Sequence, residues 1–165
     1  GVALAYSVET QPLGTGGAIR LAADRIDAWP AFVLNGDTFL ELDYRAMLDA
    51  HLRGHEQMSM AVCEVGDAGR YGALELREGR VHGFVEKGRP GPGFINAGTY
   101  LLSQGVLQRM PSGMPFSFEQ QWLVPEVGAL RPAAFAAGGV FIDMGVPEDY
   151  ARAQDLFASS RGASS

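Results

Sequence analysis

The chain has 165 residues, of which 47% are hydrophobic and 19% are charged, so it carries enough apolar material to bury one substantial core. Thirteen basic against nineteen acidic residues give a formal net charge of -6, and no block of Lys and Arg supplies the phosphate-neutralising surface that nucleic-acid binding requires. The apolar runs are too short for a membrane span, and we find no signal segment or lipidation motif, so neither nucleic acid nor a membrane is an expected partner.

The single cysteine and the two ends of the chain set further expectations. Cys63 lies in the apolar run 58–65, where we expect a small buried side chain rather than a reactive thiol. One cysteine cannot form an intrachain disulfide, which fits a reducing cytoplasm. The chain opens without an initiator Met, so we expect an upstream segment to be missing. Residues 1–158 are predicted to form one domain, truncated at its N-terminus, and the small polar residues 159–165 a disordered tail.

The first predicted unit is a strand followed by a helix. Residues 4–8 have strand-like composition and lead into the turn-rich residues 11–17. The helix is expected to start at Thr15 or Gly16 and to end at Ala28, with a partly buried apolar face.

The next segments repeat the alternation of strand and helix. The short apolar run 31–34 predicts a strand buried on both faces. Asp43 is placed to cap the helix that follows, and residues 58–65 predict another strand. Such alternation indicates parallel strands joined by helices.

The second half of the chain has a more antiparallel character. Strands are expected at residues 73–76, 81–86, 94–102, 133–136 and 140–143. The turn 77–80 joins the first two as a hairpin, and Ser117 with Gln120 forms a capping box for a helix through Trp122. Pro147 opens the last helix. We therefore predict an α/β fold, a Rossmann-like three-layer α/β/α sandwich with a mixed, mainly parallel central sheet.

Two aspartates follow apolar strands at the positions where open α/β sheets place their ligands. Asp37 ends the run 33–37 and Asp143 ends the run 140–143. Mg²⁺ is commonly held by one or two protein carboxylates, with phosphates and waters completing its coordination, so two converging aspartates suffice. The alternative is that each Asp only caps a turn.

The segment 9–19 places three glycines, Gly14, Gly16 and Gly17, where a strand passes into a helix. Glycines there let the backbone approach a ligand closely, and a helix amino terminus presents unpaired N–H groups. The spacing matches neither a P-loop nor a dinucleotide fingerprint, so an ATPase or a dehydrogenase is not indicated. A tight structural turn explains the glycines equally well.

Three further positions suggest a sugar phosphate site. Glu86 and Lys87 place a carboxylate that accepts hydroxyl hydrogens beside a cation that pairs with phosphate. Asn96 lies inside an apolar strand and needs partners, from either the backbone of a bulge or a ligand. Tyr71 and Gly72 offer backbone groups to a sugar, or simply begin a hairpin.

Taken in order, six motifs resemble those of the sugar-phosphate nucleotidyltransferase family over nearly the whole chain: Glu9 with Pro12-Leu13-Gly14-Thr15-Gly16-Gly17-Ala18, Asn35-Gly36-Asp37, Arg70-Tyr71-Gly72, Phe84-Val85-Glu86-Lys87, Phe94-Ile95-Asn96-Ala97-Gly98, and Phe141-Ile142-Asp143-Met144-Gly145 with Pro147-Glu148-Asp149-Tyr150. The resemblance implies the nucleotide-diphospho-sugar transferase fold. It also implies transfer of a nucleoside monophosphate to a sugar 1-phosphate with release of pyrophosphate.

The resemblance implies catalytic roles for Asp37, Lys87 and Asp143, with the two aspartates holding a catalytic Mg²⁺. The residues implied for sugar binding are Gly72, Glu86, Lys87 and Asn96, and those implied for the nucleotide are Glu9, Pro12, Gly14 and Thr15. The expected partners are a nucleoside triphosphate and a sugar 1-phosphate, and the assembly is either a monomer or a homo-oligomer.

Within the family, residues 7–19 together with residues 116–119 are most similar to the guanylyltransferases that act on D-glycero-D-manno-heptose 1-phosphate. Glu9 at the base pocket would accept from two N–H groups of guanine, or from the single N–H of uracil or thymine. Uridylyl-, thymidylyl- and mannose-1-phosphate guanylyltransferases therefore stay open as alternatives.

The chain departs from the family at its start. The family begins with a strand and a glycine-rich loop ending in Thr-Arg that wraps the triphosphate, and no segment here matches it. Losing one such electrostatic group lowers the rate on the order of a hundredfold or more. The remaining alternatives are an enzyme whose chain as given is inactive, and a non-catalytic module that binds nucleotide sugars.

Overall fold

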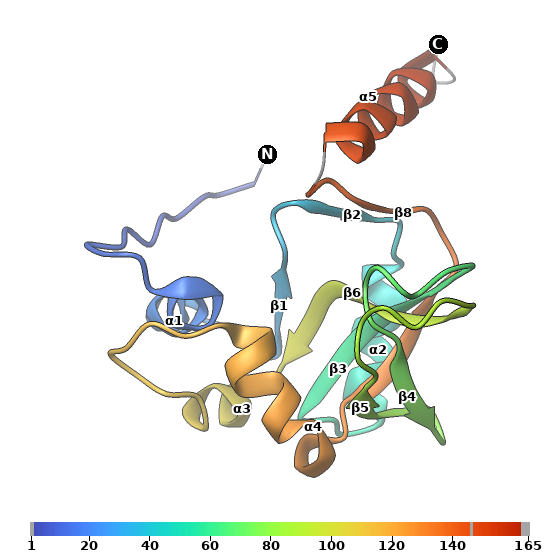
Figure 1. Ribbon diagram of the computed structural model, residues 1–165. Helices are drawn as coiled ribbons and strands as arrows, with labels where there is room; N and C mark the ends of the chain where they lie inside the picture. The colour runs from blue at the N-terminus through green and yellow to red at the C-terminus, as the bar shows by residue number, and fades with distance from the viewer. Residues whose placement is uncertain (1, 146, 163–165) are drawn as a thin grey trace.

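The computed structural model describes residues 2–145 and 147–162 (Figure 1). The helical elements are α1 (Gly14–Ala22), a 3-10 turn η1 (Ala23–Arg25), α2 (Tyr44–Arg53), α3 (Gln104–Gln108), a π-helical turn η2 (Phe118–Leu123), α4 (Val124–Leu130) and α5 (Pro147–Gly162). The strands are β1 (Ala31–Leu34), β2 (Thr38–Leu40), β3 (Met58–Val65), β4 (Leu74–Arg77), β5 (Arg80–Phe84), β6 (Gly93–Leu102), β7 (Ala133–Ala137) and β8 (Phe141–Asp143).

The strands form a six-stranded mixed sheet in the order β1-β6-β3-β7-β5-β4 and a separate two-stranded ribbon of β2 and β8. The mixed character is confirmed, but the expected mainly parallel pairing is not found. Among the pairings described within the large sheet only β3 with β7 is parallel, because β6 runs in the opposite direction between β1 and β3. β1, β3 and β7 themselves share one direction, as joined strand–helix units require.

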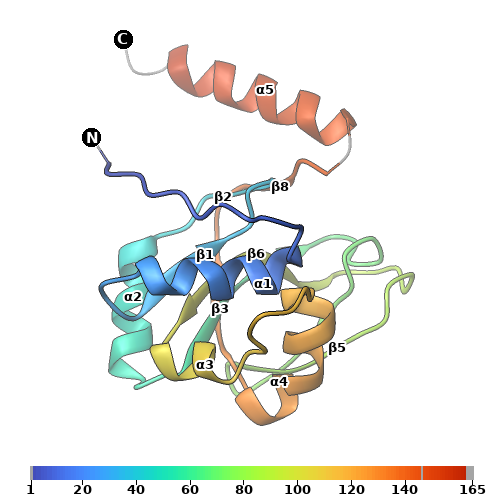
Figure 2. The same ribbon diagram turned by 90° about the vertical axis from the view of Figure 1, so that its left-hand side faces the viewer.

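Two apolar cores cover the two faces of this sheet, which confirms three layers. Alternate residues of β3 point to opposite faces, so Met60 enters one core and Ala61 the other. The first core contains Leu123 and lies under α1, α3 and α4, the helices in front of the sheet in Figure 2. The second contains Met47 of α2 packed with Ile95. Burial on both faces explains why β3 reads as a continuous apolar run.

The N-terminal segment differs from the prediction. Residues 4–8 form no strand, and the side chains of Val2, Leu4, Tyr6 and Val8 are 74–88% exposed. A strand needs a partner for its backbone groups, and this segment runs apart from the described sheet (Figure 1). The following helix begins one residue early, at Gly14, and its α-helical part ends at Ala22 rather than Ala28. At Ile26 the backbone has already become extended, because the chain must turn into β1.

The helix after Ser117 begins as predicted but winds differently. The Ser117 hydroxyl accepts from the Gln120 N–H at 3.2 Å, which confirms half of the capping box. The reciprocal bond comes from Gln121 instead, whose Oε1 accepts from the Ser117 N–H at 2.6 Å. Because a π-helical turn is wider than an α-helical one, the side chain that bonds back to the Ser117 N–H comes one residue later in the chain. By contrast, the Asp43 cap of α2 is confirmed, since its Oδ1 accepts from the Ala46 N–H at 2.9 Å.

The last helix, α5, begins at Pro147 as predicted and continues to Gly162, past residue 159 where we expected disorder to begin. The remaining residues of that tail, 163–165, lie outside the described residues. Across the described part of the chain, every helix is too short or too polar to cross a membrane.

Candidate active site

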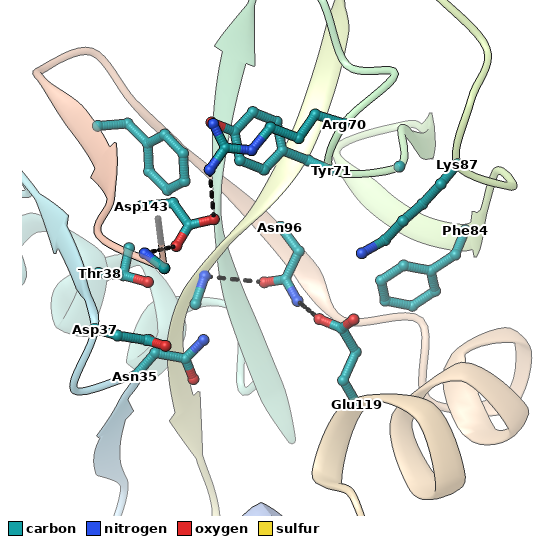
Figure 3. Close-up of a pocket in the computed structure, with 14 residues that line it drawn as sticks. Asn35, Asp37, Thr38, Arg70, Tyr71, Phe84, Lys87, Asn96, Glu119 and Asp143 are labelled. Atoms are coloured by element: carbon teal, nitrogen blue, oxygen red, sulfur yellow. Dashed lines mark hydrogen bonds and ion pairs between the residues drawn. The ribbon is translucent and has the colours of Figure 1, made fainter. Parts of the chain in front are cut away.

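A pocket of about 420 Å³ lies where β1, the β2–β8 ribbon, β6 and η2 meet (Figure 3). We call it the main pocket; it is lined by Asn35, Asp37, Thr38, Arg70, Tyr71, Gly72, Phe84, Lys87, Asn96, Gly98, Glu119, Phe141, Asp143 and Gly145. Of the sequence-predicted site residues, the structure brings five into this pocket: Asp37, Gly72, Lys87, Asn96 and Asp143.

The β2–β8 ribbon positions the two aspartates. Thr38 pairs with Asp143 in the antiparallel ladder, and the Met144 N–H donates to the Asp37 carbonyl oxygen at 2.8 Å. The Asp143 carboxylate accepts from the Gly145 N–H at 3.1 Å, which fixes its direction. Over residues 2–145 and 147–162 no three His, Cys, Asp or Glu side chains gather as a metal site. Two carboxylates facing one pocket are the oxygen donors that suit Mg²⁺ when phosphates and waters complete its coordination.

A cationic network joins this pocket to α5. Arg70 Nη2 lies 3.7 Å from Asp143 Oδ2, and Arg70 Nη1 donates to Asp149 Oδ2 at 2.6 Å. Arg152 Nη1 donates to the other oxygen of Asp149 at 2.6 Å. The hydrogen bond from Arg70, with help from Arg152, holds the pKa of Asp149 below its ordinary value. Asp149 is therefore an anchor for Arg70, which places a positive charge at the rim of the pocket.

Lys87 is the cation that enters the pocket opposite the aspartates. Its side-chain nitrogen points toward the pocket in Figure 3, and Lys87 forms no ion pair with any described residue. Gly72 has a φ of +87°, and a Cβ there would lie 3.2 Å from the Val85 carbonyl oxygen and 3.5 Å from Lys87 Cγ. Glycine at this position therefore leaves room for the Lys87 stem. An unpaired ammonium in a concave site suits an anionic ligand such as phosphate.

Asn96 is held by a network that includes an unpredicted carboxylate. Its Nδ2 donates to the Tyr100 hydroxyl and to Glu119 Oε2, each at 2.7 Å, and its Oδ1 accepts from the Gly98 N–H at 3.1 Å. The last bond lies opposite the register shift between Met60 and Val62 of β3. The bulge-stabilising role that we left open for Asn96 is therefore present, alongside its position in the pocket.

Two hollows adjoin the main pocket. The α1 hollow, of about 560 Å³, shares Asn35 and Asp37 with it and is lined by Thr15, Ala18, Ile19, Val33, Leu34, Asn35, Gly36 and Asp37. The η2 hollow, of about 440 Å³, is lined by Tyr71, Gly72, Phe84, Val85, Glu86, Lys87, Glu119, Gln120 and Val124. Glu86 faces this second hollow rather than the main pocket. We call these three adjoining hollows, taken together from α1 to η2, the groove. Asp143 lines the main pocket, and Asp37 lines both the main pocket and the α1 hollow.

The glycine-rich segment packs against protein rather than opening toward a ligand. A Cβ on Gly16 would lie 2.1 Å from the Phe116 ring, and one on Gly14, which has a φ of +67°, would lie 2.6 Å from the Phe116 carbonyl oxygen. The tight-turn alternative therefore describes these two glycines. The Thr15 hydroxyl accepts from the Phe118 N–H at 2.9 Å, which ties α1 to η2.

Two of the residues predicted to bind the nucleotide lie before α1. Glu9 and Pro12 are in the exposed N-terminal segment, and Glu9 Oε2 accepts from the Leu13 N–H at 2.8 Å. Their side chains are thus outside the main pocket, whereas Thr15 borders the α1 hollow.

Several pocket residues were absent from our predicted site. Asn35, Arg70 and Tyr71 belong to recognised motifs. The signal that could have identified them is that each stands in the same motif as a predicted site residue. Glu119 had only the weaker signal of standing in the segment 116–119. Phe84 and Phe141 also stand in recognised motifs, but as apolar strand residues they carried no separate signal that they line a pocket.

Comparison with known proteins agrees with this geometry. The family model described as Nucleotidyl transferase matches residues 1–158. The chain belongs to the nucleotidyl transferase family. Among its relatives in this family is a D-glycero-alpha-D-manno-heptose 1-phosphate guanylyltransferase from Aneurinibacillus thermoaerophilus, which is 35% identical over 93% of this chain and 67% of the relative. The enzyme of the same description from Campylobacter jejuni is 36% identical over 91% of this chain and 66% of that protein.

Solved structures of other nucleotidyltransferases share the fold of this chain. HddC from Yersinia pseudotuberculosis, complexed with GMP-PN, superposes with a TM-score of 0.78 at 42% identity, over 90% of this chain and 64% of HddC. A glucose-1-phosphate thymidylyltransferase described as putative, from Bacillus anthracis, shares the fold at 19% identity with a TM-score of 0.71, over 94% of this chain and 65% of that one. The chain thus spans about two thirds of the length of these relatives.

Proposed function

We propose that the protein containing this chain transfers a nucleoside monophosphate to a sugar 1-phosphate and releases pyrophosphate, with GTP and D-glycero-D-manno-heptose 1-phosphate as substrates. One observation carries the proposal: the main pocket combines Asp37, Asp143 and the unpaired Lys87 between two adjoining hollows. Such an arrangement suits two substrates that meet at a phosphorus atom. The heptose 1-phosphate guanylyltransferases among the relatives, and HddC with its bound GMP-PN, support this choice of substrates.

The two ends of the groove suit different substrates. The α1 hollow is lined by Thr15, one of the residues predicted to bind the nucleotide, so we assign the nucleotide to this end. The opposite end carries the groups that suit a sugar phosphate, namely Gly72, Glu86, Lys87 and Asn96. Lys87 would pair with the phosphate, and the polar side chains around it would accept or donate hydrogen bonds with hydroxyls.

Asp37 and Asp143 would hold Mg²⁺, which when bound neutralises charge on the substrate phosphates. Arg70 stands 3.7 Å from Asp143, so its own charge also reaches this region. In the reaction, an oxygen of the sugar phosphate forms a bond to the α-phosphorus of the nucleotide. The bond between that phosphorus and the bridging oxygen breaks, and pyrophosphate leaves with the electron pair. Lys87 orients the attacking phosphate, and no covalent enzyme intermediate is needed.

Residues 1–158 would form part of the catalytic unit, and a cytoplasmic location fits the buried thiol of Cys63. A second candidate substrate is mannose 1-phosphate. A probable mannose-1-phosphate guanylyltransferase 3 from Arabidopsis thaliana is 36% identical over 96% of this chain and 50% of that protein.

The deciding experiment is pyrophosphate release by the protein at its natural length, with and without Mg²⁺. Each nucleoside triphosphate is paired with heptose, mannose and glucose 1-phosphates. Release confined to GTP with heptose 1-phosphate is the expected result. Release with mannose 1-phosphate would move the substrate assignment, and binding of a nucleotide sugar without release from any pair would favour a non-catalytic binding module.

A further inference from the structure

Glu119 stands in the main pocket with a carboxylate held from two sides. Asn96 Nδ2 donates to its Oε2 at 2.7 Å, and Gln120 Nε2 donates to its Oε1 at 2.9 Å. Figure 3 shows Glu119 rising from η2 toward Asn96, on the wall of the pocket that also carries Lys87 and Phe84. Glu119 lines both the main pocket and the η2 hollow, so it lies where the main pocket meets the proposed sugar end of the groove.

The free acceptor capacity of this wall lies mainly with Glu119. Both N–H groups of the Asn96 amide are already used, by Tyr100 and Glu119, and its Oδ1 already accepts from Gly98. Asn96 therefore has no free donor for a ligand and one remaining acceptor site. An ionised carboxylate offers about four acceptor sites. Glu119 uses one on each oxygen, which leaves one on each for hydroxyls of a ligand.

The segment that carries Glu119 is rigid. The Ser117 hydroxyl caps the π-helical turn, and Phe118 next to Glu119 is buried. The Phe118 ring packs edge-on against Tyr100 with centroids 4.9 Å apart and stacks on Trp122 at 5.4 Å. Because its neighbours are locked and Asn96 fixes its carboxylate, Glu119 meets a ligand without first losing side-chain freedom. Single π-helical turns of this kind are frequent at functional sites.

We propose that Glu119 determines which sugar is accepted, and that its carboxylate receives hydrogen bonds from two neighbouring hydroxyls of the sugar 1-phosphate. Asn96 acts as the positioning residue that holds this carboxylate. The inference rests on the proposed function and adds a specificity residue to it. Glu119 is partly buried, and a sugar bound against it would cover its carboxylate further. An acceptor covered in this way disfavours an analogue that lacks the hydroxyl, since the acceptor is then left without a partner.

The test uses Glu119→Gln, which keeps the shape and one oxygen for Asn96 while removing the charge and part of the acceptor capacity. The probes are the sugar 1-phosphate with the highest turnover and its analogues that each lack one hydroxyl. We expect KM for the sugar 1-phosphate to rise roughly 10- to 100-fold, with KM for the nucleotide changed less than about twofold, since hydrogen bonds to charged groups are the stronger ones. Discrimination against the deoxy analogues should largely disappear.

The matched control is Glu126→Gln, the same substitution in α4, where the carboxylate pairs with Arg109 outside the pocket. It should leave both KM values unchanged. Asn96→Ala should reproduce the loss of discrimination, and adding it to Glu119→Gln should change discrimination little further. Thermal melting of each variant identifies a folding defect, and Glu119→Asp, which keeps the charge but withdraws it, supplies a second variant.

Unchanged discrimination in a folded, active Glu119→Gln variant would overturn the role of Glu119 and leave the proposed function intact. An equal rise of both KM values would also overturn it, because it would indicate a general disturbance of the site. If the unaltered protein releases no pyrophosphate from any pair, the proposed function fails instead. Calorimetry of sugar 1-phosphate binding then tests Glu119 directly, with at least tenfold weaker binding expected for Glu119→Gln and equal binding contradicting the proposal.

Discussion

Asp37 and Asp143 differ in how firmly the fold holds them. Asp143 is partly buried and bonded to the Gly145 N–H, whereas Asp37 is exposed and its carboxylate has no hydrogen bond to any described residue. An exposed carboxylate without partners contributes little to folding, so Asp37 can be replaced at little cost in stability.

Replacing Asp37 with Asn separates metal binding from stability. We expect Mg²⁺-dependent pyrophosphate release to fall on the order of a hundredfold or more, because the amide cannot supply the negative charge. The melting temperature should stay within about 2 °C, as for an exposed surface change. Asp27→Asn, in an exposed loop, is the control for both measurements. Full activity of Asp37→Asn would remove this residue from the metal site.

His51 should make the stability of the protein depend on pH. The ring is buried, its Nδ1 lies 2.8 Å from the Ser59 hydroxyl oxygen, and burial lowers its pKa below the ordinary 6.5, an effect that Glu56 partly offsets. The unfolded chain then binds more protons than the folded one once the pH falls below 6.5. The free energy of unfolding should decrease in that range, by at most about 1.4 kcal/mol per pH unit for one proton.

Urea unfolding at pH 7.5 and 5.5 measures this effect. His51→Asn should weaken the dependence, since an amide can still bond Ser59 but does not titrate. His55→Asn is the matched control, because His55 is exposed and Asn tolerates the positive φ of +51° found there. Equal slopes for the unaltered protein and His51→Asn would contradict the explanation.

Sequence alone identified the parts of the site that stand in motifs. Asp37, Asp143, Lys87 and Asn96 were predicted and lie together in one pocket. Glu119 was not chosen, because its contact with Asn96 joins residues that are distant in the chain and one of them lies on a π-helical turn. Amphipathic periodicity describes regular helices and strands, and it carries no signal for such a turn.

At the level of elements, α1 depends on glycines for close packing. Gly16 is buried, its N–H donates to the Phe116 carbonyl oxygen at 2.9 Å, and the Phe116 ring occupies the space that a Cβ would need. Phe116 is itself buried and cannot move aside freely. Close packing here explains why the glycine-rich turn before α1 resembles a ligand-binding loop in sequence.

Two glycine substitutions test this packing. Gly16→Ala should destabilise the protein by about 1–3 kcal/mol through overpacking against Phe116. Gly128→Ala lies in α4, where no heavy atom outside the helix approaches the Cβ position within 4 Å, and it should stabilise by about 0.4–1 kcal/mol. Denaturant unfolding measures the change in the free energy of unfolding for each variant, which should be a decrease for Gly16→Ala and an increase for Gly128→Ala. An unchanged free energy of unfolding for Gly16→Ala would mean that the loop carrying Phe116 moves aside easily.

The strands were easier to predict than the N-terminal segment because the two differ in their surroundings. β3 is apolar on both faces, and its pattern survives in the structure. Residues 4–8 are also mostly apolar, yet pairing depends on a neighbour that composition does not supply. The same reasoning applies to the direction of β6, whose inverted place between β1 and β3 depends on chain topology rather than on its residues.

At the scale of the whole molecule, an aromatic pair and a charged network are among the contacts that join α5 to the body. Figure 1 shows it set beyond the β2–β8 ribbon, where Phe157 packs edge-on against Phe39 with centroids 4.8 Å apart. Asp149 binds Arg70 and Arg152 through a side chain that is only 7% exposed. The lowered pKa of Asp149 means that its stabilising effect is present above pH 3.8 and is lost as the pH falls through the lower folded-state value.

Asp149→Asn should therefore loosen α5 without unfolding the domain. Amide hydrogen exchange near neutral pH is expected to accelerate over residues 147–158 while β3 and β6 keep their protection. Glu148→Gln removes a neighbouring exposed charge from the same first helical turn and should change exchange much less. Faster exchange throughout the sheet would show that the network supports the entire fold and not α5 alone.

The β2–β8 ribbon sets a limit on how the length of this chain can vary in evolution. Its register pairs Thr38 with Asp143, and shifting one strand by a single residue would turn the Asp143 side chain to the opposite face. Insertions or deletions of one residue between Thr38 and Leu40, or between Phe141 and Asp143, should be far rarer in nature than point substitutions. The hairpin turn at Glu78 and Gly79 is exposed and lines none of the three hollows, so it should tolerate changes in length more readily than the ribbon, although the Gly79 carbonyl oxygen accepts from the Ala134 N–H at 2.8 Å.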